Sequence, residues 1–475
     1  MLVLAGAWIP VFPASPSLAA GDDHLLFIRE DGSLWGLGSA ADGQLGKVGR
    51  APQRALALID GRKWSRVSAG TAFSMAIHED GTLLAFGRNH SAQLGKGSRK
   101  VFMNPKPVGD HRWREVAAGV DATLAVRSDG SLRVWGGWKD GLAANGLSGI
   151  QGLSRVAGVG RWKAVAMGPD HALALRENGT LWALGDNASG QTGCGDQKAY
   201  PIPCPVGEAR WKAMAAGEKF SAGIREDGTL WTWGANEKGE AGRGTMGPTE
   251  GMGQVGSDTW VALSAGPHHV LALRSDKTLW AWGAGEEGAL GLGRRESRNQ
   301  PVQVGNETWI AIAAGRNFSA GLRKDGGLMI WGNLGFTGIQ AGPEGQPIAD
   351  YPVPADGNWV PGMAATVESP AQEAPAPAPT VETPAPAEAK PQVEPEATVV
   401  EAEPAAAQPP VVPRRTKEES WIEKQKNHLI AGGVVLAAGG ALWAYLSSFS
   451  TEAKDKSKVD PLGNPPQDPV IQGAP

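Results

Sequence analysis

Short runs of small or apolar residues recur along the first three quarters of the chain, and each run ends at a glycine or an acidic turn. The unit that begins at Trp211 reads WKAMAAGEKFSAGIREDGTLWTWGANEKGEAGRG. Alternation with a period of two predicts strands over 211–216, 220–224 and 229–233. The dipeptide Asp227-Gly228 predicts a tight hairpin between the second and third strands, because a primed turn requires positive φ.

The same unit recurs seven times with a period of 49 residues. Glycine ends the first strand in all seven units, from Gly21 to Gly315, and tryptophan begins it in six, from Trp64 to Trp309. A fourth, short strand ends on a valine in five units, namely at Val108, Val206, Val255, Val304 and Val353. Seven units of four antiparallel strands predict an all-β fold, a seven-bladed β-propeller over residues 21–365 whose blades bury their faces against each other.

The aromatic residues fit this architecture as packing elements. The chain has 19 Trp and 67 Gly, the composition of a repeated turn with a large apolar anchor. Two sets of tryptophans occupy strand positions two residues apart, on one sheet face: Trp182, Trp231 and Trp280, and Trp135, Trp233, Trp282 and Trp331. We expect these rings to pack between blades. One further position alternates between His and Phe: His24, His171 and His269 against Phe73, Phe220 and Phe318. Such alternation indicates packing rather than catalysis.

Composition excludes several classes of function. Lys+Arg 45 against Asp+Glu 49 gives a net charge of −4, which argues against a dedicated nucleic-acid surface. No phosphate-binding glycine loop, metal-ligand spacing or catalytic constellation is recognisable, so we expect neither a cofactor, a metal site nor enzymatic activity. Two cysteines are too few for a disulfide scaffold or a four-cysteine zinc site. Cys194 and Cys204 lie in one inter-strand loop, where they form either a local disulfide or two ordinary thiols.

The repeat pattern W..vaAG..hs.al..DG.lw.wG.n..GqlG, fullest in the second, fourth and fifth units, resembles that of the regulator of chromosome condensation family. The resemblance covers about residues 15–365. Members of that family include a eukaryotic nucleotide-exchange factor for a small GTPase and a secreted bacterial β-lactamase inhibitor protein. The resemblance therefore implies a protein-binding disc. No exchange-specific motif and no basic chromatin-binding tail can be matched to this sequence.

The region after the repeats predicts a membrane anchor. Residues 366–413 are rich in Pro, Ala and Glu and predict a disordered linker, and residues 414–428 form a charged juxtamembrane segment. Residues 429–449 carry no charge and have the length of a single transmembrane helix, followed by a polar tail over 450–475. The small residues Gly433, Ala437 and Ala441 are spaced as in weakly pairing membrane helices, which would give a dimer.

Residues 1–20 support two interpretations. Their apolar start and small-residue end resemble a signal peptide, but SLAAG also places Gly21 in register as the end of a first propeller strand. In the first case the segment around Trp359 could supply that strand and the propeller would be extracytoplasmic, which we favour. In the second case the propeller would be cytoplasmic and tail-anchored. The distribution of Lys and Arg about residues 429–449 mildly favours the cytoplasmic alternative.

The turns that vary between units are the candidate binding surface, because the first and third turns of a four-stranded meander emerge on one face. The candidate residues are Asp121, Asp170, Glu218, Lys219, His268, Arg316 and Asn317. The opposite face carries a regular ring, Arg29, Arg127, Arg176, Arg225, Arg274 and Arg323 with His78 in the seventh place, which we interpret as a strand-end charge pattern.

We therefore expect a membrane-anchored, non-catalytic module that binds a protein partner through its propeller loops. Two alternatives stay open. One is a regulatory or exchange factor for a cytoplasmic GTPase. The other is an envelope hydrolase or carbohydrate-binding propeller, which would need clustered carboxylates or exposed tryptophans in the central channel.

Overall fold

The computed structural model describes residues 17–46, 49–95, 99–137, 150–156, 160–248, 251–337 and 348–355. Residues 1–16 and those from 356 onward lie outside this set, so the linker, the juxtamembrane segment, the transmembrane helix and the polar tail stay predictions. Within the described residues, no helix has the length and apolar character needed to cross a bilayer.

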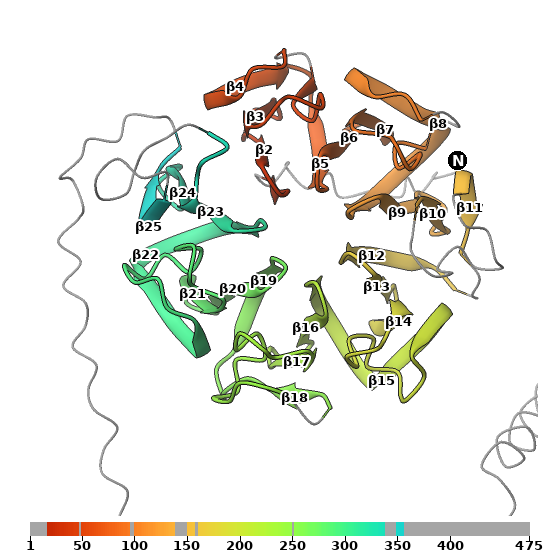
Figure 1. Ribbon diagram of the computed structural model, residues 1–475. Coiled ribbons are helices and arrows are strands. Elements are labelled where there is room, and N and C mark those ends of the chain that lie inside the picture. The colour runs from red at the N-terminus through yellow and green to blue at the C-terminus, as the bar shows by residue number, and fades with distance from the viewer. Residues whose placement is uncertain are drawn as a thin grey trace, which may run out of the picture. The chain divides into compact units, whose positions relative to one another are not determined.

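The described strands form four antiparallel sheets that together make seven four-stranded blades arranged in a ring (Figure 1). In chain order the strands are β1 (Ser17–Ala20), β2 (His24–Ile28), β3 (Leu34–Gly38), β4 (Gln53–Asp60), β5 (Trp64–Ala69), β6 (Phe73–His78), β7 (Thr82–Gly87), β8 (Phe102–Ala118), β9 (Ala122–Arg127), β10 (Leu132–Gly136), β11 (Ile150–Arg155), β12 (Trp162–Met167), β13 (His171–Arg176), β14 (Thr180–Asp186), β15 (Ala199–Ala216), β16 (Phe220–Arg225), β17 (Leu230–Gly234), β18 (Gly253–Gln254), β19 (Trp260–Ala265), β20 (His269–Arg274), β21 (Thr278–Gly283), β22 (Arg298–Ala314), β23 (Phe318–Arg323), β24 (Leu328–Asn333) and β25 (Ile348–Pro354).

Three of the four sheets join two blades. Strands β8, β15 and β22 are 17, 18 and 17 residues long, and each forms the outer strand of one blade and the inner strand of the next. Blades 2 and 3, 4 and 5, and 6 and 7 are therefore continuous in hydrogen bonding, whereas blade 1 (β1 to β4) is a separate sheet. The expected separate four-stranded units are thus fused in pairs, because the chain stays extended as it passes inward from one blade to the next.

Each predicted hairpin turn is held by the side chain of its Asp or, in blade 4, of Asn178. In blade 5 the Asp227 carboxylate accepts a 2.9 Å hydrogen bond from the Thr229 amide, and Gly228 has φ of 93°. Lys277 takes the glycine position in blade 6 and still adopts φ of 70°. A side chain in this left-handed region is strained, because its Cβ crowds the following carbonyl.

The core lies between neighbouring blades and depends on tryptophan. Trp233 of blade 5 is buried, and its Nε1 donates a 2.9 Å hydrogen bond to the Gln191 carbonyl of blade 4. Its ring centroid lies 5.7 Å from that of Trp211 on the inner strand of the same blade. The same indole-to-carbonyl bond recurs at Trp135, Trp282 and Trp331. Burial of these rings between blades explains why so many tryptophans recur in register.

The alternation of His and Phe also arises at blade interfaces. His171 is completely buried, and its Nε2 is 2.8 Å from the Ser221 hydroxyl of the next blade. Ser221 in turn donates to the Gln191 carbonyl at 2.8 Å. Equivalent pairs join His24 to Ser74 and His269 to Ser319. Burial lowers the pKa of His171 to about 4, so the imidazole is neutral and part of the core.

Blade 7 closes the ring directly onto blade 1. Strand β1 pairs with β2 in the register Ser17↔Ile28 and is the innermost strand of blade 1. The Arg316 amide donates to the Gly21 carbonyl at 3.3 Å, and the Arg316 guanidinium pairs with Asp22 at 3.0 Å. The expectation that the segment around Trp359 would supply this strand is wrong, because Ser17–Ala20 occupies its place.

A candidate interaction surface on the loop face

The loop face carries the turns between the first and second strands of the blades and the described parts of the turns between the third and fourth strands. The two turns of a blade are braced against each other by one repeated backbone hydrogen bond. The His268 carbonyl accepts it from the Ala284 amide at 2.8 Å, the Lys219 carbonyl from Ala235 at 2.8 Å, and the Asp121 carbonyl from Gly137 at 2.9 Å. Each first turn is therefore held rigidly, while its side chain changes from blade to blade.

The structure brings two of the predicted residues together between blades 5 and 6. The His268 Nε2 lies 3.1 Å from a Glu218 carboxylate oxygen, and both side chains are partly exposed. The Glu218 amide also donates to the Pro267 carbonyl at 3.0 Å, which ties the two first turns together. Lys219 follows Glu218 in the same turn and is exposed. The residues Glu218, Lys219 and His268 thus form one charged cluster on the loop face.

Glu240 belongs to this cluster and was not predicted. It is buried, and it lies 3.4 Å from the Nδ1 of His268, so the imidazole sits between two carboxylates. The hydrogen bond from His268 to Glu240 raises the pKa of the imidazole, and the negative charge of Glu218 adds to this rise. The sequence did contain a signal for Glu240, because blades 1, 2 and 4 have glutamine at this position of the repeat and blade 5 has glutamate.

The glutamate keeps the structural role of those glutamines. A Glu240 carboxylate oxygen accepts a 2.7 Å hydrogen bond from the Lys238 amide, as Gln93 and Gln191 do from the amides two residues before them. The other carboxylate oxygen is then free to face His268. Blade 5 therefore has the same turn geometry as blades 2 and 4, but it places a carboxylate instead of an amide under the loop face.

The other predicted residues do not join this cluster. The amide of Gln93 lies 3.4 Å from the Asp121 carboxylate within the blade 2–3 junction, and Asp170 is half-buried on blade 4. Arg316 is engaged with Asp22 in closing the ring. Asn317 is exposed beside it. The predicted positions thus lie on one face, and Glu218 and His268 are a pair in close contact.

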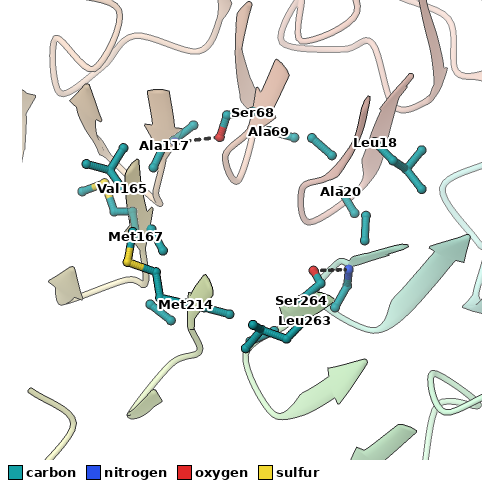
Figure 2. A pocket seen from close by; sticks show the side chains of 18 of the residues that line it. Leu18, Ala20, Ser68, Ala69, Ala117, Val165, Met167, Met214, Leu263 and Ser264 are labelled. Atoms are coloured by element: carbon teal, nitrogen blue, oxygen red, sulfur yellow. Dashed lines mark hydrogen bonds between the residues drawn. The ribbon is translucent and has the colours of Figure 1, made fainter. Parts of the chain in front are cut away.

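The central channel is lined mainly by small and apolar side chains. Figure 2 shows the side chains from the inner strands that surround a cavity of about 230 Å³. Its two side-chain hydroxyl groups, on Ser68 and Ser264, accept hydrogen bonds from the Ala118 and Ala314 amides at 2.9 and 3.0 Å. Among the described residues that line the cavity there is neither a carboxylate nor a tryptophan. The features that a hydrolase or sugar-binding channel would need are therefore not found there.

A disulfide joins Cys194 and Cys204 on blade 4, with a Cα–Cα distance of 6.0 Å. It links the turn after β14 to strand β15, at the outer part of the blade. In the described part of the chain, no group of three or more His, Cys, Asp or Glu side chains is arranged to hold a metal ion.

Comparisons with known proteins agree with this geometry. The description "Regulator of chromosome condensation (RCC1) repeat" matches residues 276–322, and a second description of the same repeat matches 162–191, 211–240 and 260–289. The propeller is built of RCC1-like repeats. These matched segments lie in blades 4 to 6 and the first part of blade 7, and they include the residues of the charged cluster.

Several solved structures share the fold at low sequence identity. Human WBSCR16 is 21% identical with a TM-score of 0.56, and the match covers 63% of this chain and 84% of that protein. Prp20p from Saccharomyces cerevisiae is 19% identical with a TM-score of 0.58, covering 71% and 86%. Yeast RCC1 (Prp20), in its complex with Kap60, is 19% identical with a TM-score of 0.59, and the match covers 73% of this chain and 86% of that protein. No curated protein gives a significant sequence match.

Proposed function

We propose that this chain is a membrane-anchored interaction module that binds a protein partner through the loop face of its propeller. The observation that carries the proposal is the charged cluster of Glu218, Lys219 and His268, presented on turns whose backbone is braced in the same way in every blade. A rigid backbone that presents variable polar side chains is suited to specific recognition, because little conformational entropy is lost on binding.

The sequence supports the membrane anchor, and a disulfide supports the compartment in which the propeller lies. The uncharged stretch 429–449 has the length of a spanning helix, and the linker of about 50 residues reaches on the order of 40 Å as a coil. Disulfides persist mainly in oxidising compartments, so the bond between Cys194 and Cys204 favours an extracytoplasmic propeller.

Regulation of a cytoplasmic GTPase is the alternative that the fold suggests. The published description of Prp20p names binding to Gsp1p and histones, and the likeness of this chain to Prp20p is one of fold. Such a role requires the propeller to face the cytoplasm. We favour the extracytoplasmic module because a reducing cytoplasm would keep Cys194 and Cys204 as thiols. Because Ser17–Ala20 forms strand β1, a leader for this export would have to be cleaved before Ser17 rather than after residue 20.

The two proposed functions are distinguished by the compartment in which the propeller lies. Intact cells that express the full-length chain are treated with a membrane-impermeant thiol reagent, before and after a membrane-impermeant reductant. We expect labelling of Cys194 and Cys204 only after reduction. Labelling that requires cell lysis but no reduction would contradict the extracytoplasmic module and favour the GTPase alternative.

Binding through the loop face is tested by charge reversal. The full-length protein, with Lys219→Glu or with Lys324→Glu as a control of equal charge change, is used to capture proteins from envelope extracts. Lys324 is exposed on a hairpin turn of blade 7, on the opposite face. We expect a protein that binds the wild type and the control, and that is lost with Lys219→Glu. Equal capture by all three would contradict the proposed surface.

A further inference from the structure

Positive charge gathers on the outer segments of blades 1 and 2. We define the outer segment of a blade as the residues between the glycine of its third strand, such as Gly38, and the next inner strand. The described parts of these segments contain nine Lys or Arg, three Asp and no Glu in blades 1 and 2, a net charge of +6. In blades 4 to 7 they contain seven Lys or Arg and eleven Asp or Glu, a net charge of −4. Blade 3 is not counted, because most of its outer segment lies outside the described residues. The residues counted are 39–46, 49–63, 88–95 and 99–112 in blades 1 and 2, and 186–210, 235–248, 251–259, 284–308, 333–337 and 348–355 in blades 4 to 7.

Ion pairs neutralise only part of this positive charge. Asp42 pairs with Arg88 at 2.6 Å, and Asp60 pairs with Arg62 at 2.8 Å. Five further cations on the outer segments of blades 1 and 2 are exposed, and none of them forms an ion pair with another described residue. They are Arg50, Arg54, Arg99, Lys100 and Lys106.

The two outer segments adjoin each other, and we call their five unpaired cations the basic rim. Blades 1 and 2 are neighbours in the ring (Figure 1). The turn of blade 1 that precedes Arg50 lies against the outer strand of blade 2, because a Cβ added at Gly43 would lie 2.9 Å from the Met103 sulfur. Arg50 and Arg99 are 49 residues apart, so they occupy the same position of the repeat in neighbouring blades.

Positive charge extends along the edge of the propeller from one face to the other. Three cations of the basic rim lie in turns at the loop face, and Arg54 and Lys106 follow on the outer strands β4 and β8. Lys63 is exposed near the hairpin face, which carries the turns between the second and third strands. Its Cα would lie 3.3 Å from a Cβ added at Gly32 of such a turn. An apolar side chain accompanies these charges, since Leu58 on β4 is 49% exposed.

We propose that the basic rim docks the edge of the propeller on the anionic lipid headgroups of the membrane that anchors the chain. This inference rests on the anchor in the proposed function. Each Lys or Arg that comes near an anionic bilayer adds to the attraction, which falls off within a Debye length. The linker over 366–413 reaches on the order of 40 Å as a coil, so it keeps the basic rim close to that surface.

A lipid surface fits the basic rim better than an acidic protein does. Headgroups form a continuous negative layer, so they attract every exposed cation along the edge without individually matched contacts. The exposed Leu58 adds apolar area, and basic and apolar side chains together are typical of surfaces that lie in the headgroup region. The patch also offers few acceptors to the donors of a protein partner, because Asp42 and Asp60 already pair with arginines.

The repeat itself provides variants that should fold. Blade 4 has Gln197 where blades 1 and 2 have Arg50 and Arg99, so Arg50→Gln/Arg99→Gln copies a residue already present at this position. The control is Lys198→Gln/Arg294→Gln, which removes two exposed cations from the outer segments of blades 4 and 6. Neither Lys198 nor Arg294 forms an ion pair with another described residue, so the control changes the net charge equally and breaks no such pair.

Docking is measured by energy transfer from the propeller tryptophans to a dansyl label on the lipid headgroups of vesicles. The full-length chain carries Trp421→Phe/Trp443→Phe, which removes the two tryptophans next to and within the predicted span. It is reconstituted with phosphatidylcholine alone or with equal parts of phosphatidylcholine and phosphatidylglycerol. We expect at least about twofold more transfer with phosphatidylglycerol, and a fall to the phosphatidylcholine value in about 1 M sodium chloride, where the Debye length is about 3 Å.

The variants test whether the basic rim causes this increase. Arg50→Gln/Arg99→Gln should lose at least about half of the increase, and Lys198→Gln/Arg294→Gln should keep nearly all of it. Equal transfer from the wild type with the two lipid compositions would overturn the proposal. So would an equal loss in the two double variants, which would indicate an effect of net charge rather than of this patch.

Two further measurements separate docking from the anchor and from an acidic protein partner. Flotation of the chain with phosphatidylcholine vesicles reports the predicted anchor, whereas the increase in transfer caused by phosphatidylglycerol reports the basic rim, so the two failures are distinguishable. The double variants are also used to capture proteins from envelope extracts. If Arg50→Gln/Arg99→Gln loses a captured protein but keeps the full increase in transfer, the basic rim binds an acidic protein and the proposal is overturned.

Discussion

His171 is buried against Ser221 of the next blade, and its replacement tests the structural explanation of the His/Phe alternation. The junction between blades 5 and 6 has Phe220 and Val270 at the corresponding positions, so the double variant His171→Phe/Ser221→Val copies a junction already present in this chain. The Gln191 carbonyl loses the Ser221 hydroxyl but keeps the Trp233 indole as a donor. We expect the variant to fold with a stability within about 1 kcal/mol of the wild type at pH 7.5.

The two proteins should differ in how their free energy of unfolding depends on pH. Burial lowers the pKa of His171 from 6.5 to about 4 in the folded protein. Below pH 6.5 the unfolded chain therefore binds a proton that the folded protein does not, and the free energy of unfolding falls as the pH falls. Between pH 7.5 and 5.0 this one histidine should cost about 2 kcal/mol, and the double variant should lose about 2 kcal/mol less than the wild type over the same interval.

The assay is urea unfolding at both pH values, followed by tryptophan fluorescence, with the disulfide kept oxidised. His24 and His269, whose pKa values are lowered to about 3 and about 4 by burial, remain in both proteins and so contribute equally. An equal loss of stability in the wild type and the double variant would refute the view that His171 is held neutral in the core.

Three further predictions address single positions. Lys277→Gly relieves the positive φ at an exposed hairpin turn and should raise the unfolding free energy by about 1 kcal/mol in urea titrations; an unchanged or lower value would contradict strain there. Glu240→Gln, which copies the glutamine of three other blades, should lower the pKa of His268 in an NMR titration, and a pKa equal to that of the wild type would show that Glu240 does not set it. Trp282→Ala removes a fully buried ring and the hydrogen bond to the Glu240 carbonyl, and should cost about 3–5 kcal/mol in the same urea assay; a loss below 1 kcal/mol would contradict its role between blades.

The repeat made the propeller predictable, because glycine and tryptophan recur at positions where only their properties fit. Gly228 adopts positive φ at the hairpin, and Trp233 fills the space between blades 4 and 5. The period alone could not show how the ring closes. Strand β1 lacks the tryptophan that begins the other inner strands, since Ser15 stands in its place, so the pattern was weakest where the chain joins its own beginning.

The site was less predictable, because it depends on side chains from different blades. Glu218 and His268 are 50 residues apart and meet only because adjacent first turns lie side by side. Glu240 looked like one more member of a turn motif, and its charge gains importance only beside His268. The arginine ring was predicted as a charge pattern, but its stacking on tryptophans such as Trp231 depends on side-chain geometry that spacing does not reveal.

Photo-crosslinking in living cells tests the central claim, that the loop face binds a protein partner, most directly. A photoreactive phenylalanine derivative replaces Lys219 on the loop face or Lys324 on the hairpin face, both exposed. The account predicts a discrete crosslinked protein adduct from position 219 that is absent from position 324. Adducts from position 324 alone, or none from position 219, would contradict a partner-binding loop face.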